Sequence, residues 1–120
     1  MPKTTVVFYR ENPSSVPVLD WLDSLPKKAL DKCLVRIERL RDLGQLRRPE
    51  ADLLREGIYE LRVRLGTVNY RMFYFFHGRI AAVLAHALIK ENEVPQRDIE
   101  LAIRRRRNFE SDPERHTYKE

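Results

Sequence analysis

Two arginines lie within apolar stretches of the chain that otherwise have the composition of β-strands. Arg62 and Arg71 are flanked by Tyr, Leu, Val, Met and Phe, which fit a half-buried, pleated surface. If the two strands pair, alternation can place both side chains on one face of a sheet, where two guanidinium groups can hold one phosphate or a developing phosphorane. The alternative is that both arginines are exposed or ion-paired with Glu60, because charged residues on the open face of an antiparallel sheet are common.

A titratable group and a cation follow in the next apolar stretch. His86 and Lys90 are four residues apart, so in a strand they share a face and could offer proton transfer and a fixed positive charge. A lone histidine in an apolar strand is more often a core residue with satisfied hydrogen bonds. Glu60 could act as a general base, or it could be a solvated or paired carboxylate.

Further basic residues are candidates for contact with nucleic acid. Residues 104–107 are four consecutive arginines, and at most two of them, such as Arg104 and Arg105, can address the same groove from one helix. A solvated helix end, which the helix dipole also favours, is the alternative interpretation. Arg64 belongs to the same predicted strand as Arg62 and is a third candidate for RNA binding.

The sequence gives little support for a metal ion or another cofactor. His77, His86 and His116 lack paired-ligand spacing, and no acidic cluster indicates a magnesium site. There is also no phosphate-binding P-loop and no dinucleotide-binding glycine motif. We therefore expect no metal and no cofactor. Cys33 is the only cysteine, which excludes an intrachain disulfide and favours a reducing, cytoplasmic setting.

The composition predicts one small, basic domain. The chain has 120 residues, 34% of them charged, and a net charge of +5, which favours acidic or phosphate-bearing partners without distinguishing RNA, DNA, membranes and proteins. The short apolar run at the N-terminus fits neither a signal peptide nor a membrane span, so we expect no membrane association. We predict a single domain over residues 1–110 and a flexible tail over 111–120.

Periodicity and turn residues predict the order strand, two helices, three strands, helix. The stretch 45–56 is expected to be a polar connector. The most regular helix pattern places Leu30, Cys33, Leu34, Ile37 and Leu40 on one apolar stripe that Gly44 ends. The predicted segments are strand 4–9, helices 18–25 and 26–43, antiparallel strands 58–65, 68–76 and 80–89, and a helix after Pro95. This order indicates an α+β fold with the helices on one face of the sheet and the other face open for binding.

Five motifs, in order along most of the chain, resemble the HigB-like, phage-derived branch of the RelE/ParE toxin superfamily. They are PVLDWLDSLP at 17–26, GIYELRV at 57–63, NYRMFYFF at 69–76, LAHALIK at 84–90 and VPQRDIELAIRR at 94–105. The resemblance implies a small RelE-like α+β domain with N-terminal helices packed on a curved antiparallel sheet and a C-terminal helix.

The resemblance also implies a function and a set of site residues. Such proteins are toxins of type II toxin–antitoxin pairs that cleave mRNA on the ribosome by attack of a ribose 2′-hydroxyl on the adjacent phosphate, without a metal. Arg62 and Arg71 match the basic positions at the scissile phosphate. His86 matches the position expected for proton transfer, and Lys90 matches the position expected for phosphate binding. The implied partners are mRNA and a cognate antitoxin, either a helix-turn-helix protein or a small acidic protein.

The chain departs from many relatives near the last of these positions. Where they have a second lysine and a threonine that caps the last helix, this chain has Glu91 and Val94, and no tyrosine is present in the predicted last helix. Two other functions therefore stay open. One is a ParE-like toxin that inhibits DNA gyrase without cleaving RNA, and the other is a non-catalytic binding module derived from a toxin.

Overall fold

The computed structural model describes residues 4–78, 81–90 and 93–119. The predicted α+β class is confirmed. Over these residues the chain forms, in order, β1 (Thr5–Phe8), α1 (Pro17–Asp23), α2 (Lys27–Leu43), β2 (Ala51–Arg55), β3 (Ile58–Leu65), β4 (Val68–His77), β5 (Ala81–Ile89) and α3 (Gln96–Ser111).

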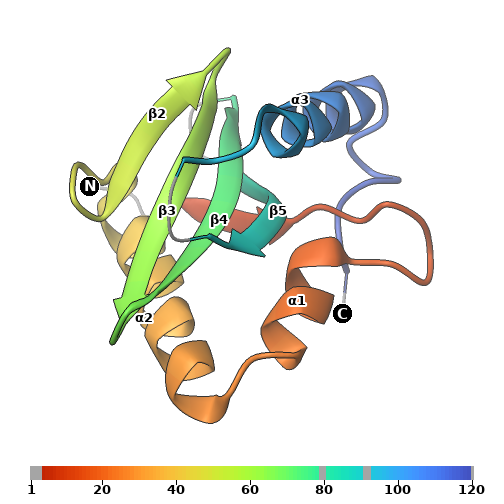
Figure 1. Cartoon of the computed structure of the whole chain (residues 1–120). Helices are drawn as coiled ribbons and strands as arrows, with labels where there is room; N and C mark the ends of the chain where they lie inside the picture. The colour runs from red at the N-terminus through yellow and green to blue at the C-terminus, as the bar shows by residue number, and fades with distance from the viewer. Residues whose placement is uncertain (1–3, 79–80, 91–92, 120) are drawn as a thin grey trace.

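All five strands belong to one curved sheet, whose spatial order is β1-β5-β4-β3-β2 (Figure 1). Strands β3 and β4 pair antiparallel, as do β4 and β5, which confirms the predicted meander. The turn between β3 and β4 contains Gly66, whose φ of 63° is readily adopted only by glycine. At the far edge β1 pairs with β5 in parallel, so the sheet is mixed.

The connector predicted at 45–56 contains a strand, so that prediction was wrong. Strand β2 pairs antiparallel with β3 through a two-residue turn at Glu56 and Gly57, both with positive φ angles of 50° and 77°. Turns of this kind match the twist of paired strands and are typical of hairpins. The polar side chains of β2 lie at the sheet edge, which explains why the segment has the composition of a loop.

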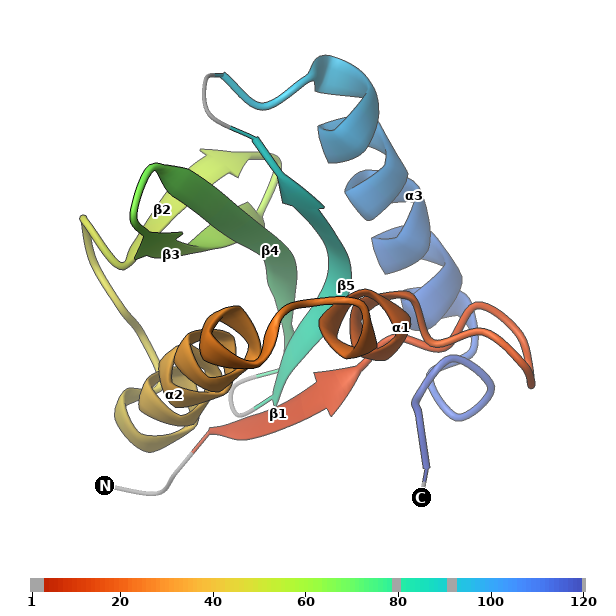
Figure 2. The ribbon, with the colours of Figure 1, turned by 60° about the horizontal axis from the view of Figure 1, so that its bottom comes forward.

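Helices cover both faces of the sheet, which corrects the expectation of one open face (Figure 1, Figure 2). Helices α1 and α2 pack on one face, whereas α3 packs on the other. The reason is that α3 has an apolar side of its own, formed by Ile99, Ala102 and Phe109, which is buried against Phe73 and Phe75. The space available for a ligand on this face is therefore beside α3.

Helix α2 follows its predicted pattern with one exception. Cys33, Ile37 and Leu40 are buried, but Leu34 is 46% exposed, because the apolar stripe that contacts the sheet is narrower than predicted. Gly44 ends the helix as expected, with a φ of 74° and its N–H donating to the carbonyl of Leu40 at 2.8 Å.

The segment after α3 runs beside the end of β1. Arg10 N–H donates to the carbonyl of His116 at 2.8 Å, and Tyr118 N–H donates to the carbonyl of Phe8 at 2.9 Å. The ring of His116 also stacks on that of buried Tyr9, with 5.2 Å between the centroids. The segment predicted as a flexible tail thus makes backbone and ring contacts with the domain.

Candidate functional site

Arg62 and Arg71 are direct neighbours across the β3–β4 ladder. Their Cα atoms pair in the register of the two strands, so both side chains project from the face that α3 partly covers. The prediction that alternation places them together is confirmed. The short turn at Gly66 fixes this register, since a slip by one residue would move one arginine to the opposite face.

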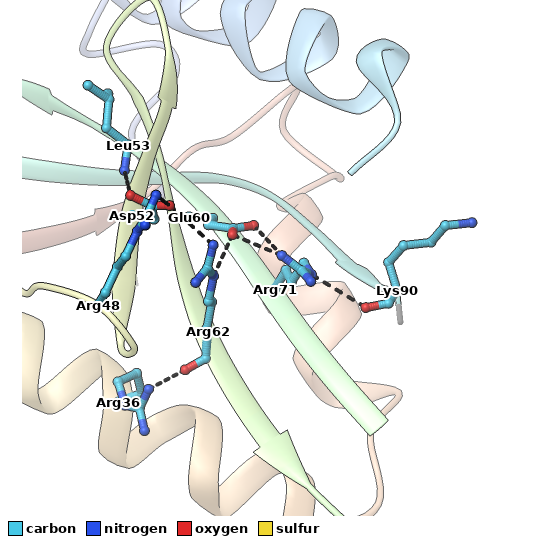
Figure 3. A network of polar contacts seen from close by, with 8 residues as sticks. All are labelled: Arg36, Arg48, Asp52, Leu53, Glu60, Arg62, Arg71 and Lys90. Carbon is cyan, nitrogen blue, oxygen red and sulfur yellow. Dashed lines mark hydrogen bonds and ion pairs between the residues drawn. The ribbon is translucent and has the colours of Figure 1, made fainter. Parts of the chain in front are cut away.

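A buried carboxylate holds the two arginines together (Figure 3). Arg71 Nη1 donates to both carboxylate oxygens of Glu60 at 2.9 Å, and Arg62 Nε donates to Glu60 Oε1 at 2.6 Å. The side chain of Glu60 is 1% exposed, that of Arg71 15% and that of Arg62 35%. The interpretation in which the arginines are ion-paired with Glu60 therefore describes this structure.

A second carboxylate comes from β2, the strand that sequence analysis missed. Asp52 Oδ2 accepts from Arg62 Nη2 at 3.2 Å and lies 2.9 Å from Arg48 Nη2. The hydrogen bond from Arg48 lowers the pKa of Asp52 below its usual value. Together with Glu60 and Arg71, the described part of this cluster contains three arginines and two carboxylates. Glu56-Gly57, as a hairpin turn before β3, is the sequence signal that could have revealed this strand.

The arginine pair lies in an open pocket of about 440 Å³. The sheet forms its floor, and the start of α3 and the segment before it form one wall. Its lining residues are Leu54, Arg55, Glu60, Arg62, Arg71, Glu93, Val94, Gln96 and Ile99. An anionic group that enters the pocket would meet guanidinium groups already held in place by carboxylates, a geometry suited to phosphate or carboxylate recognition.

The structure does not bring the Lys90 ammonium group to the arginine pair. Lys90 lies just beyond β5, and its backbone carbonyl accepts from Arg71 Nε at 3.4 Å. Its side chain is exposed and points away from the Arg62–Arg71 cluster (Figure 3). The two residues are therefore close through their backbones, and a shared ligand would require the Lys90 side chain to turn.

His86 occupies a different part of the same face. Phe73 pairs with Glu60 on one side and with His86 on the other, so the three residues form a row across three strands. His86 is therefore two strand spacings, roughly 10 Å, from Glu60. His86 Nε2 is 2.7 Å from Asp98 Oδ1 and His86 Nδ1 is 3.3 Å from Arg105 Nη1, so both ring nitrogens have partners on α3.

These two partners select one tautomer of the neutral His86 ring. Arg105 can only donate, so Nδ1 must accept and Nε2 carries the proton toward Asp98. Burial, reinforced by the charge of Arg105, lowers the pKa of His86 below its usual value, although Asp98 acts in the opposite direction. A neutral histidine that joins β5 to α3 is the satisfied core residue described as the alternative in the sequence analysis.

The arginine run at 104–107 does not form one basic surface. Arg105 is 12% exposed and donates to the carbonyl of Ala85 at 2.8 Å and to Glu11 at 3.3 Å. Its guanidinium group also lies over the ring of Tyr9, 5.7 Å from the centroid. Arg105 is therefore part of the packing between α3, β5 and the segment after β1.

The neighbours of Arg105 point elsewhere. Arg104 is exposed, and its Nη2 lies 3.7 Å from Glu11. Arg106 Nη1 donates to the carbonyl of Glu56 in the β2–β3 turn at 2.9 Å. Arg64, the third predicted RNA contact, is exposed near the end of β3, where its Nε donates to the carbonyl of Gly66 at 3.0 Å. The structure thus places Arg64 on the Arg62 strand, apart from α3.

Metal ligands do not gather anywhere in the part of the chain that the structure describes. Within residues 4–78, 81–90 and 93–119, no group of three or more His, Cys, Asp or Glu side chains is arranged to hold an ion. Cys33 is a buried residue of α2, and this burial raises the pKa of its thiol to about 11, so the thiol stays protonated at neutral pH.

The chain matches a known protein family over most of its length. The model of the phage-derived Gp49-like protein family matches residues 20–107, which include the end of α1, all of α2, the strands β2 to β5 and most of α3. The chain therefore belongs to the Gp49-like family. That family is part of the RelE/HigB-like toxin group and is associated with toxins of toxin–antitoxin systems.

No curated protein matches the chain, so no single relative contributes to the assignment. None of the helices described here is long and apolar enough to cross a membrane.

Proposed function

We propose that this protein is the toxin of a type II toxin–antitoxin pair and that it cleaves mRNA on the ribosome. The observation that carries the proposal is the pair Arg62 and Arg71, held opposite each other in an open pocket by a buried carboxylate. Membership of the Gp49-like family supports the toxin assignment. Cleavage, the ribosome and the individual roles below belong to the proposal.

RNA supplies its own nucleophile in the proposed reaction. The ribose 2′-oxygen forms a bond to the adjacent phosphorus, the bond from phosphorus to the 5′-oxygen breaks, and the 2′-hydroxyl proton leaves while the 5′-oxygen gains one. The products are a 2′,3′-cyclic phosphate and a 5′-hydroxyl. The protein must stabilise the negative charge of the phosphorane, and two guanidinium groups fixed beforehand are suited to that task.

Glu60 has the supporting role in this proposal. Because its carboxylate bonds to both arginines, it fixes the separation and orientation of their planar groups. It is also a carboxylate in direct contact with the phosphate-binding groups and hence the acceptor we propose for the 2′-hydroxyl proton. To accept it, Glu60 must exchange one arginine bond for the substrate, which a phosphate bound between Arg62 and Arg71 would promote.

His86 and Lys90 have lesser roles in this geometry. His86 would have to leave Asp98 or Arg105 before it could transfer a proton, so we assign it to positioning α3, which forms one wall of the pocket. Lys90 has an exposed side chain next to Arg71, and we keep it as a second phosphate contact that forms when its side chain turns.

A second function is favoured by one specific observation. Glu60 and Asp52 already pair with Arg62 and Arg71, as expected if the arginines only stabilise the fold. In that case the protein would act by binding, either as a gyrase-directed toxin or as a non-catalytic module. This candidate predicts growth arrest without RNA cleavage, or no arrest.

Controlled expression distinguishes these functions. The wild type, Arg71→Lys and Arg107→Lys are induced in a bacterial host without the antitoxin, and growth and the 5′ ends of mRNA are followed together. Lysine keeps a cation beside Glu60 but loses the planar fork, so we expect Arg71→Lys to lose at least tenfold in cleavage. Arg107→Lys, the same change at an exposed position of α3, should behave as the wild type.

Three outcomes would decide the question. New 5′-hydroxyl ends in the wild type, strongly reduced in Arg71→Lys at equal protein level, support the proposed cleavage. Arrest with DNA damage and without new ends would instead identify a gyrase-directed toxin. Normal growth on expression of the wild type would identify a binding module and contradict the proposal.

A further inference from the structure

One edge of the sheet is open beyond the end of β2. The pairing of β2 with β3 reaches only Leu61, and the N–H of Arg62 then donates to the carbonyl of Glu50 at 2.7 Å. Strand β3 continues to Leu65, and no other described strand lies along this part of its edge. By strand alternation, the N–H and carbonyl of Arg64 point in the same outward direction as those of Arg62.

Basic side chains of α2 donate hydrogen bonds to the backbone carbonyl groups of this edge. The Arg36 guanidinium group donates to the carbonyl of Arg62, and Lys32 Nζ donates to the carbonyl of Arg64 at 3.1 Å. Long charged side chains are a known way to protect a strand edge from pairing. Each of these side chains holds its carbonyl by one hydrogen bond, unlike a neighbouring strand, and can turn away from it; Arg36 would keep its ion pair with Glu50.

The space between α2 and β3 forms a groove of about 330 Å³ beside this edge. Four of its lining residues are basic and one is acidic, and Val35 contributes an apolar surface that is 61% exposed. The α2–β3 groove is lined by Asp31, Lys32, Val35, Arg36, Arg39, Val63 and Arg64. Glu50 compensates part of the charge of Arg36 and Arg39, and an excess of positive charge remains.

We propose that the edge of β3 at 62–65 and the α2–β3 groove bind an extended, acidic segment of a partner protein, which adds to the sheet as a further strand. The segment's N–H groups would take the places of Lys32 and Arg36 on the two carbonyls, and one of its carbonyls would accept from the N–H of Arg64. The released basic side chains would then pair with its carboxylates, and Val35 would contact an apolar residue between them.

The edge chemistry favours a polypeptide over RNA. Alternating carbonyl and N–H groups along β3 match the backbone of another strand, whereas RNA would use the basic side chains alone. The groove adjoins the arginine site through Arg62, whose backbone lies at the edge and whose side chain contacts Glu60. A bound strand would therefore sit next to the pocket. The surface stands independently of the proposed function, and if that function holds, the antitoxin is the partner.

A synthetic peptide tests the surface directly. The ¹⁵N-labelled full chain is titrated with a capped peptide of alternating glutamate and valine, and amide signals are followed by NMR. We expect saturable shifts at Val63, Arg64 and Val35. The same peptide with N-methylated valines cannot donate from those positions and should bind at least tenfold more weakly, because strand pairing requires those N–H groups.

Matched variants separate the groove from general basic charge. Lys32→Glu and the milder Lys32→Gln change an exposed residue of α2 and should weaken binding about tenfold and severalfold, respectively. Arg107→Glu makes the same charge change as Lys32→Glu, on exposed α3, and should change binding less than twofold.

Three results would overturn the inference. One is the absence of shifts at β3 up to about 1 mM peptide, a concentration that detects even weak sites. Another is equal binding of the N-methylated peptide, which would mean that only charge attracts it. The third is a stronger response of the same amides to a short oligouridylate, which would identify a nucleic-acid surface. Because none of these measurements involves RNA cleavage, failure here leaves the proposed function untouched.

Discussion

Two groups of arginines in this chain differ in how their separation along the sequence relates to their proximity in the fold. The strand arginines Arg62 and Arg71 are nine residues apart, yet the β3–β4 register makes them direct neighbours in a pocket. The arginines at 104–107 are adjacent in sequence, but they diverge around α3, and Arg105 is buried in contacts with Glu11 and Ala85. A run of basic residues in the sequence therefore does not predict that their side chains meet. The strand register predicts it better, as for Arg62 and Arg71.

The two groups also differ in what the charge does. Arg105 stabilises the fold by joining three segments and has little surface left for a ligand. Arg62 and Arg71 share one buried carboxylate and still face a pocket. Burying such charges lowers the stability of the fold unless the hydrogen bonds between them are well aligned. The variants below test this distinction, from the largest expected effect to the smallest.

The largest effect on stability should come from Arg71→Met. The change leaves buried Glu60 with Arg62 as its remaining arginine, so we expect a loss of about 3 kcal/mol in the free energy of unfolding, measured in urea. The double variant Glu60→Leu with Arg71→Met removes the buried charge as well and should be more stable than the single variant. A double variant less stable than Arg71→Met would contradict the proposed cause.

A smaller loss is expected within the arginine run. Arg105→Met removes the bonds to Ala85, Glu11 and His86, and should lower the free energy of unfolding by about 2 kcal/mol. Arg107→Met changes an exposed position and should alter it by less than about 0.5 kcal/mol. Equal effects of the two substitutions would show that the run acts as a uniform charged surface after all.

The smallest effect concerns the pH dependence of stability. The pKa of His86 is lowered in the folded state, mainly by burial, so the unfolded chain binds a proton more readily near its ordinary pKa of about 6.5. This contribution to stability is complete above that pH and is lost as pH falls through it toward the lower folded pKa. Urea unfolding at pH 7.5 and 5.5 should show a drop that is reduced in His86→Gln, and an identical drop would exclude His86 as its source.

Most of the fold was predictable because its signals are local. The apolar periodicity of α2, Gly44 at its end and the alternation in β3 each act within a few residues, and these predictions were confirmed except for Leu34. Strand β2 was missed because its polar residues lie at the sheet edge, where alternation is weak. The position of α3 on the second face, and the parallel pairing of β1, depend on contacts between distant segments.

The candidate site was predictable only in part, for the same reason. Alternation predicted that Arg62 and Arg71 share a face, and the register confirmed it. The burial of Glu60 between them depends on β2, which pairs with β3 beside Glu60, and on α3, which lines the same pocket, and no local pattern indicates it. The same limit applies to His86, whose two partners on α3 are 12 and 19 residues away in sequence.

The central claim is that the strand arginines, and not those of α3, contact the RNA phosphate. The most direct measurement is an NMR titration of the arginine Nε–H signals with an oligonucleotide that cannot react because it lacks the 2′-hydroxyl. We predict that the signals of Arg62 and Arg71 shift together and saturate, while that of Arg105 stays unchanged. Shifts confined to the arginines at 104–107, with Arg62 and Arg71 unaffected, would contradict the claim.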